Sequence, residues 1–180
     1  LIDAKVTLIL ARLNELQLLA TIHPKLTWDD WIEIRLAKLQ NQPAADDWEL
    51  DSPPNHNHIR QQIAYTFWSL RLTSPEITSL ADRLKLSAAL RRVLLAARSL
   101  WKHLPGLPDR RISEVTAYLD EIPALARYGV FLACEDTQLA DLLKQHTQEW
   151  RFIKPSIDGQ NLRQRGLAPG PAYKEILSRL

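Results

Sequence analysis

Cationic side chains recur at helical spacing in the segment that follows Ser87. Arg91, Arg98 and Lys102 are separated by seven and four residues, so at about 100° per residue they share one flank of a helix. The row spans roughly 16 Å at a rise of about 1.5 Å per residue, which suits successive phosphates of a nucleic acid backbone. The alternative is an ordinary solvated flank whose arginine stems cover apolar neighbours, and position alone slightly favours that alternative.

Charge is segregated along the chain. Segments 59–111 and 151–180 carry net charges of +7 and +4, whereas 27–51 and 112–150 each carry −5, so the total of +2 conceals two basic blocks. Such blocks indicate a surface that faces a polyanion. On charge alone, the alternative that surface helices simply alternate in charge is equally supported. Arg110 and Arg111, at the end of the first basic block, are further candidates for contact with a nucleic acid backbone.

The histidines, the cysteine and the carboxylates show no spacing typical of a catalytic or metal site. His56 and His58 stand two residues apart, a spacing that cannot place both rings on one helix face, and an exposed loop is expected there. Cys134 closes an apolar run and is expected to be a buried structural thiol. The sequence has no His-Glu-x-x-His motif and no phosphate-binding glycine loop. No catalytic residue and no metal ligand are therefore predicted.

The composition limits the class of protein. Its 180 residues are 46% hydrophobic and 24% charged, which is too apolar for a disordered tail. One cysteine excludes a disulfide framework, and no apolar run is long enough for a membrane span, so the cytoplasm is the simplest expected compartment. The absence of methionine, with Leu1 as the first residue, predicts that the chain is a fragment of a longer protein.

Apolar residues at three- and four-residue spacing predict an all-α, elongated array of about ten helices with no sheet. The clearest helix runs from Ser87 to about His103, with an apolar stripe at Leu90, Val93, Leu94, Ala97, Leu100, Trp101 and Leu104. Capping residues and prolines place the other helices at 2–22, from Thr27, 59–70, from Ser74, from Ser113, from Pro123, 136–150, 158–165 and from Pro169.

The polar, proline-broken segment 41–58 is expected to be a poorly ordered or projecting loop. Five of the six tryptophans fall on or beside apolar stripes and are expected in the core. Trp48, in the loop, is the one tryptophan expected to be exposed. Since base stacking needs exposed aromatic rings among basic residues, stacking is not the expected mode of RNA binding.

The last 25 residues contain the most specific pattern. A short helix is expected to end at Gly166, and the turn Pro169–Pro171 then begins another helix. Gly170 has no side chain, so a phosphate can approach the amides of that helix start, within sequence reach of Arg163 and Arg165. The slightly favoured alternative is that the turn only fixes the angle between two helices.

The residues 157–162 (Ile-Asp-Gly-Gln-Asn-Leu), with the turn 166–171 and Ile176-Leu177, resemble the C-terminal region of bacterial tRNA nucleotidyltransferases and poly(A) polymerases, the class II CCA-adding family. Residues 12–26 resemble the end of that family's neck region, and 77–136 resemble the body of a long, cyanobacterial-type member. Asn161 and Lys174 stand where the family commonly has aspartate and glycine.

The resemblance implies three regions: the end of the neck at 1–50, a helical body at 51–150 and the start of a tail at 151–180. It also implies a tRNA-binding fragment that holds the RNA backbone and is itself inactive, because the glycine-rich head motif G-G/S-x-x-R-D does not occur in the sequence. No cofactor is expected here, and Mg²⁺ with ATP or CTP would serve the head of the parent protein. A helical protein-interaction or dimerisation module without an RNA role is the alternative, and a homodimer is left open.

Overall fold

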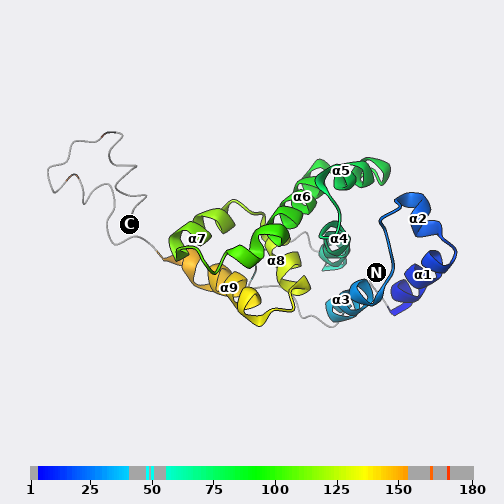
Figure 1. Ribbon diagram of the computed structural model, residues 1–180, viewed down its shortest axis with the longest axis horizontal. Helices are drawn as coiled ribbons and strands as arrows, with labels where there is room; N and C mark the ends of the chain where they lie inside the picture. Colours follow the sequence, from blue (N-terminus) through cyan, green and yellow to red (C-terminus); the bar gives the residue numbers. More distant parts are fainter. Residues whose placement is uncertain are drawn as a thin grey trace.

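The computed structural model describes residues 4–40, 48, 50, 56–153, 163 and 170. These residues contain helices and no strand, so the predicted all-α class is confirmed. The nine α-helices within them are α1 (Ala4–Glu15), α2 (Leu18–Ile22), α3 (Asp30–Gln40), α4 (His56–Ser69), α5 (Ser74–Arg83), α6 (Ala88–His103), α7 (Ile112–Asp120), α8 (Ala124–Ala133) and α9 (Thr137–Gln148), with 3₁₀ turns η2 (Leu104–Gly106) and η3 (Trp150–Phe152). They follow a long axis, with α1 and α2 at one end and α7 and α9 at the other (Figure 1).

Several predicted helix starts are confirmed by their capping bonds. Ser87 Oγ accepts a hydrogen bond from the amide of Leu90 at 3.2 Å, and α6 begins at the next residue. Asp136 Oδ1 accepts the first free amides of α9 at 2.9 and 3.2 Å. Pro123 directly precedes α8, as predicted. Each bond satisfies an amide that the carbonyls of its own helix cannot reach.

The first predicted helix is wrong in one respect, because the chain breaks between α1 and α2. Gln17 has a left-handed backbone, with φ 56° and ψ 17°, and such a residue cannot continue a right-handed helix. The turn before it tightens, since the amide of Gln17 donates to the carbonyl of Asn14 at 2.9 Å. His23 ends α2, as the residue before a proline was expected to do.

Two predicted caps are displaced. Asp29 Oδ1 accepts the amide of Ile32 at 3.1 Å, so Asp29, and not Thr27, caps α3. The carbonyl of Thr27 instead accepts the indole N–H of Trp68 at 3.0 Å. Ser113 lies inside α7, whose N-cap is Arg111. In both helices the N-cap lies two residues from the predicted one. The local sequence pattern does not fix a helix boundary more closely than one or two residues.

Part of the predicted loop 41–58 is helical. α4 begins at His56, so His56 and His58 belong to a helix and the expected exposed loop around them is wrong. The remainder of the loop, apart from Trp48 and Leu50, lies outside the described residues, as do the expected helices at 158–165 and after Pro169. α9 ends at Gln148, two residues earlier than predicted, and η3 follows it.

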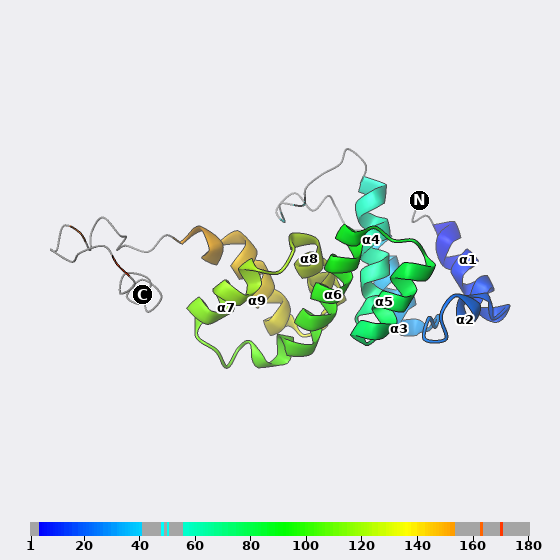
Figure 2. The same ribbon diagram turned by 90° about the horizontal axis from the view of Figure 1, so that it is seen from above.

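The predicted apolar stripe of α6 is confirmed and places this helix at the centre of the core. Its buried residues are Leu90, Leu94, Ala97, Leu100 and Leu104, with Val93 and Trp101 partly buried. α6 lies between α8 on one side and α4 and α5 on the other (Figure 2). The stripe joins the two hydrophobic clusters along its length, because Leu90 and Leu94 belong to the smaller cluster and Ala97, Leu100 and Leu104 to the larger one.

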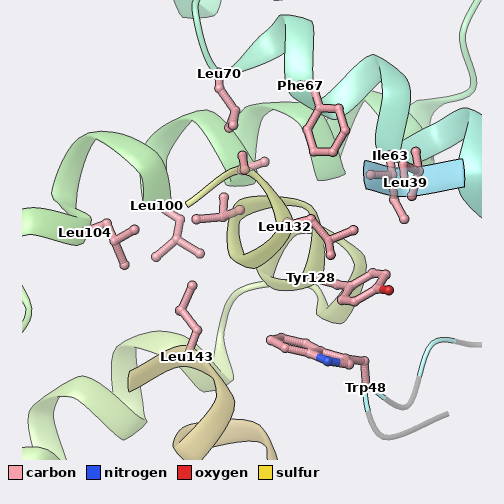
Figure 3. Packing of buried hydrophobic residues seen from close by; sticks show 14 of the residues in the cluster. Leu39, Trp48, Ile63, Phe67, Leu70, Leu100, Leu104, Tyr128, Leu132 and Leu143 are labelled. Atoms are coloured by element: carbon pink, nitrogen blue, oxygen red, sulfur yellow. The ribbon is translucent and has the colours of Figure 1, made fainter. Parts of the chain in front are cut away.

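Trp48 contradicts its predicted exposure. The side chain is 6% exposed, and its ring centre lies 5.1 Å from that of Tyr128 and 4.8 Å from that of Phe131 (Figure 3). Both partners belong to α8, which contributes Ala126, Tyr128, Val130, Leu132 and Ala133 to the larger cluster. The residues around Trp48 in the sequence are polar, which led to the wrong prediction. Burial of the large indole ring is nevertheless favourable, because it removes much apolar surface from water.

Each hydrophobic cluster combines residues from both sides of position 50. The larger one packs Ile32, Leu36 and Leu39 of α3 against residues of α4, α6 and α8. The smaller one packs Leu19 and Leu26 against α5 and α6. Residues 8–39 and 58–153 are thus joined by common packing, and the predicted boundaries at 50 and 150 stay predictions.

Candidate nucleic-acid interface

The predicted cationic row of α6 is partly engaged within the fold. Arg91 forms an ion pair with Asp82 of α5, and its side chain is one-third exposed. Arg98 is partly buried, and its Nε donates to the carbonyl of Leu72 at 2.6 Å. These bonds tie α6 to α5 and to the segment before it. Of the three residues in the row, Lys102 is the exposed one, whereas Arg91 and Arg98 are partly buried.

Lys102 belongs to a second group of cations where α6 ends and α7 begins. The turn between them is anchored by Leu104 and Leu107, which are 2% and 0% exposed. After this turn the chain runs back, and His103 at the end of α6 lies against α7. We call the exposed residues Lys102, His103, Arg110 and Arg111 the basic corner.

Tyr118 of α7 organises the basic corner. The guanidinium carbon of Arg110 lies 6.0 Å from the centre of its ring, which is within cation–π distance. The imidazole of His103 approaches the same ring edge-on, with the centres 6.5 Å apart. One aromatic ring therefore holds residues from α6 and from the turn before α7 in a common place.

The orientation of His103 leaves one ring nitrogen available. Its Nδ1 lies 2.8 Å from the carbonyl oxygen of Ser99, and since a carbonyl only accepts, Nδ1 carries the proton of this bond. Nε2 lies on the other side of the ring and can meet a ligand. Asp109 is the one carboxylate within 102–111, so this stretch holds three cations against one anion, with histidine counted as neutral.

The predicted tail residues are described only in part. Arg163 and Gly170 are exposed, whereas Arg165 and the other residues of the expected phosphate-binding turn lie outside the described residues. The turn 166–171 therefore stays a prediction. The basic corner is the cationic group whose geometry the structure gives.

Arg35 is a buried cation whose role the sequence did not indicate. Its side chain is 3% exposed and stacks on Trp31, with the guanidinium carbon 3.7 Å from the ring centre. Nε and Nη2 donate to the carbonyl of Ala133 at 3.0 and 2.9 Å, and Nη2 also pairs with Glu135 at 2.9 Å. Burial lowers the pKa of Arg35, and the bond to Glu135 partly offsets this. Arg35 thus binds the carbonyl at the end of α8 and has a structural role.

The described residues hold no group of three or more histidine, cysteine, aspartate or glutamate side chains placed to bind a metal ion. Cys134 is partly buried, and its thiol donates to the carbonyl of Asp136 at 3.4 Å. Burial raises its pKa, which favours the thiol over the nucleophilic thiolate. In the same part of the chain, no helix has both the length and the apolar character required to cross a membrane.

An apolar cavity of about 350 Å³ lies between the first two helices and α4 and α5. Its walls include Leu13, Ile22, Tyr65 and Trp68. The opposite faces of α1 and α2 expose large apolar side chains, among them Leu8, 72% exposed. This end of the molecule therefore differs in character from the basic corner.

Comparison of the chain with protein-family models, with curated proteins and with solved structures finds no match. The resemblance carried by residues 157–177 therefore stays a prediction.

Proposed function

We propose that this chain is the tRNA-holding C-terminal region of a tRNA nucleotidyltransferase or poly(A) polymerase, and that the basic corner contacts the RNA backbone. The observation that carries the proposal is that the ring of Tyr118 contacts both His103, which follows Lys102 in α6, and Arg110, which precedes Arg111. This brings the two exposed cationic segments close to one another. Phosphate contacts from lysine and arginine position a nucleic acid without reading its sequence, which suits a protein that holds many tRNAs.

The proposed phosphate contacts differ from the cationic row of α6 that the sequence predicted. Lys102, Arg110 and Arg111 are exposed and lie where α6 ends and α7 begins, whereas Arg91 and Arg98 are partly buried and bond to residues outside α6. In the proposed parent, nucleotide addition belongs to a head that uses Mg²⁺ with ATP or CTP. This chain contributes binding, and we expect no incorporation of labelled ATP into tRNA by the purified chain.

The experiment is a titration of fluorescein-labelled tRNA, followed by anisotropy at several salt concentrations. The variant carries Lys102→Ala, Arg110→Ala and Arg111→Ala. The matched control carries Lys25→Ala, Lys38→Ala and Lys144→Ala, which removes the same charge from exposed positions on other faces.

The basic-corner variant is expected to lower the slope of log K against log salt by about 0.7–0.9 for each lost contact. The control variant is expected to keep nearly the slope of the original chain. Equal losses in both variants would mean that net charge alone drives binding. An unchanged slope in the first variant would place the RNA surface elsewhere.

The alternative function, a helical interaction or dimerisation module, is favoured by one observation. α1, the turn after it and the start of α2 expose large apolar side chains: Leu8 at 72%, Ile9 at 55%, Leu16 at 51% and Leu18 at 44%. Large exposed apolar groups of this kind mark interaction surfaces. Sedimentation velocity tests this function. It would be supported if the original chain is a dimer and the double variant Leu8→Gln, Leu16→Gln is a monomer.

A further inference from the structure

A buried polar network connects the last residues of α7 to α8 and α9. His146 of α9 is 0% exposed and Arg127 of α8 is 4% exposed. Nη1 of Arg127 lies 3.2 Å from Nδ1 of His146 and donates to the carbonyl of Leu119 at 3.2 Å. Nε2 of His146 lies 3.0 Å from Oδ1 of Asp120, the last residue of α7. We call these four residues the His146 network.

The partners of His146 determine where its proton lies. A guanidinium has donors and no acceptor, so Nδ1 must offer a lone pair to Arg127. The single proton of the neutral ring is therefore on Nε2 and is donated to Asp120. The network is complete only while the imidazole is neutral, because a second proton would occupy the lone pair that Arg127 needs.

The charges around the ring oppose that second proton more than they favour it. Burial is the first cause that lowers the pKa of His146, and Arg127 of α8 is the second. Asp120 of α7 acts in the opposite direction, but its side chain is half exposed and its field is weakened by water. Arg151 of η3 adds to the positive side.

α7 has little buried surface of its own to hold it in place. Val115 and Leu119 are the two buried residues of this helix, whereas α8 buries seven of its ten. Both ties of the network, the carbonyl of Leu119 and the carboxylate of Asp120, hold the same end of α7. A helix with so little buried surface opens at a small cost once such ties are lost.

We propose that the His146 network is a pH-sensitive latch, and that protonation of His146 releases α7 from α8 and α9 while the core stays folded. Arg111 is the N-cap of α7, so release also displaces one cation of the basic corner. That last consequence rests on the proposed function, whereas the latch itself does not.

The test is amide hydrogen exchange of the full chain between pH 7.5 and 5.0, with protection corrected for the intrinsic pH dependence of exchange. Protection in α7 is expected to fall by up to about tenfold for each pH unit below about 6.5, since one proton is taken up on opening. Protection in α8 is expected to persist. His146→Gln should abolish the pH dependence in α7, and His58→Gln, the same change on an exposed ring of α4, should retain it.

A second measurement needs no variant. The nitrogen chemical shifts of the imidazoles report the tautomer of His146 in the original chain, and a neutral ring with its proton on Nε2 at pH 6 is expected. A ring already protonated at pH 6.5, or a proton on Nδ1, overturns the proposal. Simultaneous loss of protection in α7 and α8, or an unchanged pH dependence in folded His146→Gln, also overturns it.

Discussion

Gly129 of α8 packs so closely on Thr66 of α4 that a side chain at position 129 would force the neighbouring atoms to shift. A Cβ placed on Gly129 would lie 2.7 Å from Cγ2 and 3.2 Å from Cβ of Thr66. Thr66 is fully buried, and its hydroxyl donates to the carbonyl of Gln62 at 3.0 Å, which fixes its rotamer. The contact therefore sets how closely α4 and α8 can pack.

Gly129→Ala is expected to lower the free energy of unfolding by about 1–2 kcal/mol, because overpacking outweighs the helix propensity that alanine adds. Urea unfolding measures the change. Adding Thr66→Ser, which removes Cγ2, should restore part of the loss. Gly106→Ala is the control, since no atom lies within 4 Å of a Cβ there, and it should change stability by less than about 0.5 kcal/mol. Equal effects at both glycines would contradict the close approach.

Ser87→Ala is expected to cost about 1 kcal/mol, because the first turn of α6 loses the acceptor of the amide of Leu90. Ser99, exposed in the middle of the same helix, is the matched control. Ser99→Ala should stabilise the chain by a few tenths of a kcal/mol, because alanine has the higher helix propensity. Thermal or urea unfolding measures both variants. A change in the free energy of unfolding with the same sign in both would argue against the cap.

The features that the sequence predicted correctly depend on neighbours within one or two helical turns. The stripe from Leu90 to Leu104 repeats at the helical period, and Ser87 and Asp136 cap with their own side chains. Periodicity and capping chemistry are local, so a single chain suffices to read them. All-α architecture follows from the same signals.

The features that the sequence missed depend on distant partners. Arg91 and Arg98 share a helix flank, as predicted, but Asp82 and the carbonyl of Leu72 reach that flank from other elements. Cation spacing within one helix does not reveal such partners. The role of Tyr118 in gathering the basic corner was missed for the same reason, since the turn after α6 first has to reverse the chain.

Trp48→Ala is expected to lower the free energy of unfolding by about 3–5 kcal/mol, the usual cost of deleting a buried aromatic side chain. The loss follows from its contacts with Tyr128 and Phe131, about eighty residues later in the chain. Trp48→Phe should cost less, because a phenyl ring fills part of the space. An unfolding midpoint unchanged in Trp48→Ala would show that the indole is exposed, as the polar sequence around it first indicated.

Acidification is expected to reduce global stability through His146. Burial lowers the pKa of this ring in the folded chain, whereas the unfolded ring titrates near 6.5. Between the folded pKa and about 6.5, the unfolded state binds more protons, so its free energy falls relative to the folded state as pH decreases. Stability from His146 is complete above about pH 6.5 and declines below it by up to about 1.4 kcal/mol per pH unit.

Urea unfolding at pH 7.5, 6.5, 6.0 and 5.5 measures this decline, and the folded His146→Gln variant should show a flatter profile over the same range. Glu76 adds a separate decline at lower pH, because the amide and hydroxyl of Thr73 lower its pKa in the folded chain. The contribution of Glu76 is present above its unfolded pKa of about 4.3 and is lost as pH falls through its folded pKa. A profile above pH 5.5 that is the same with histidine and with glutamine at position 146 would exclude His146 as its origin.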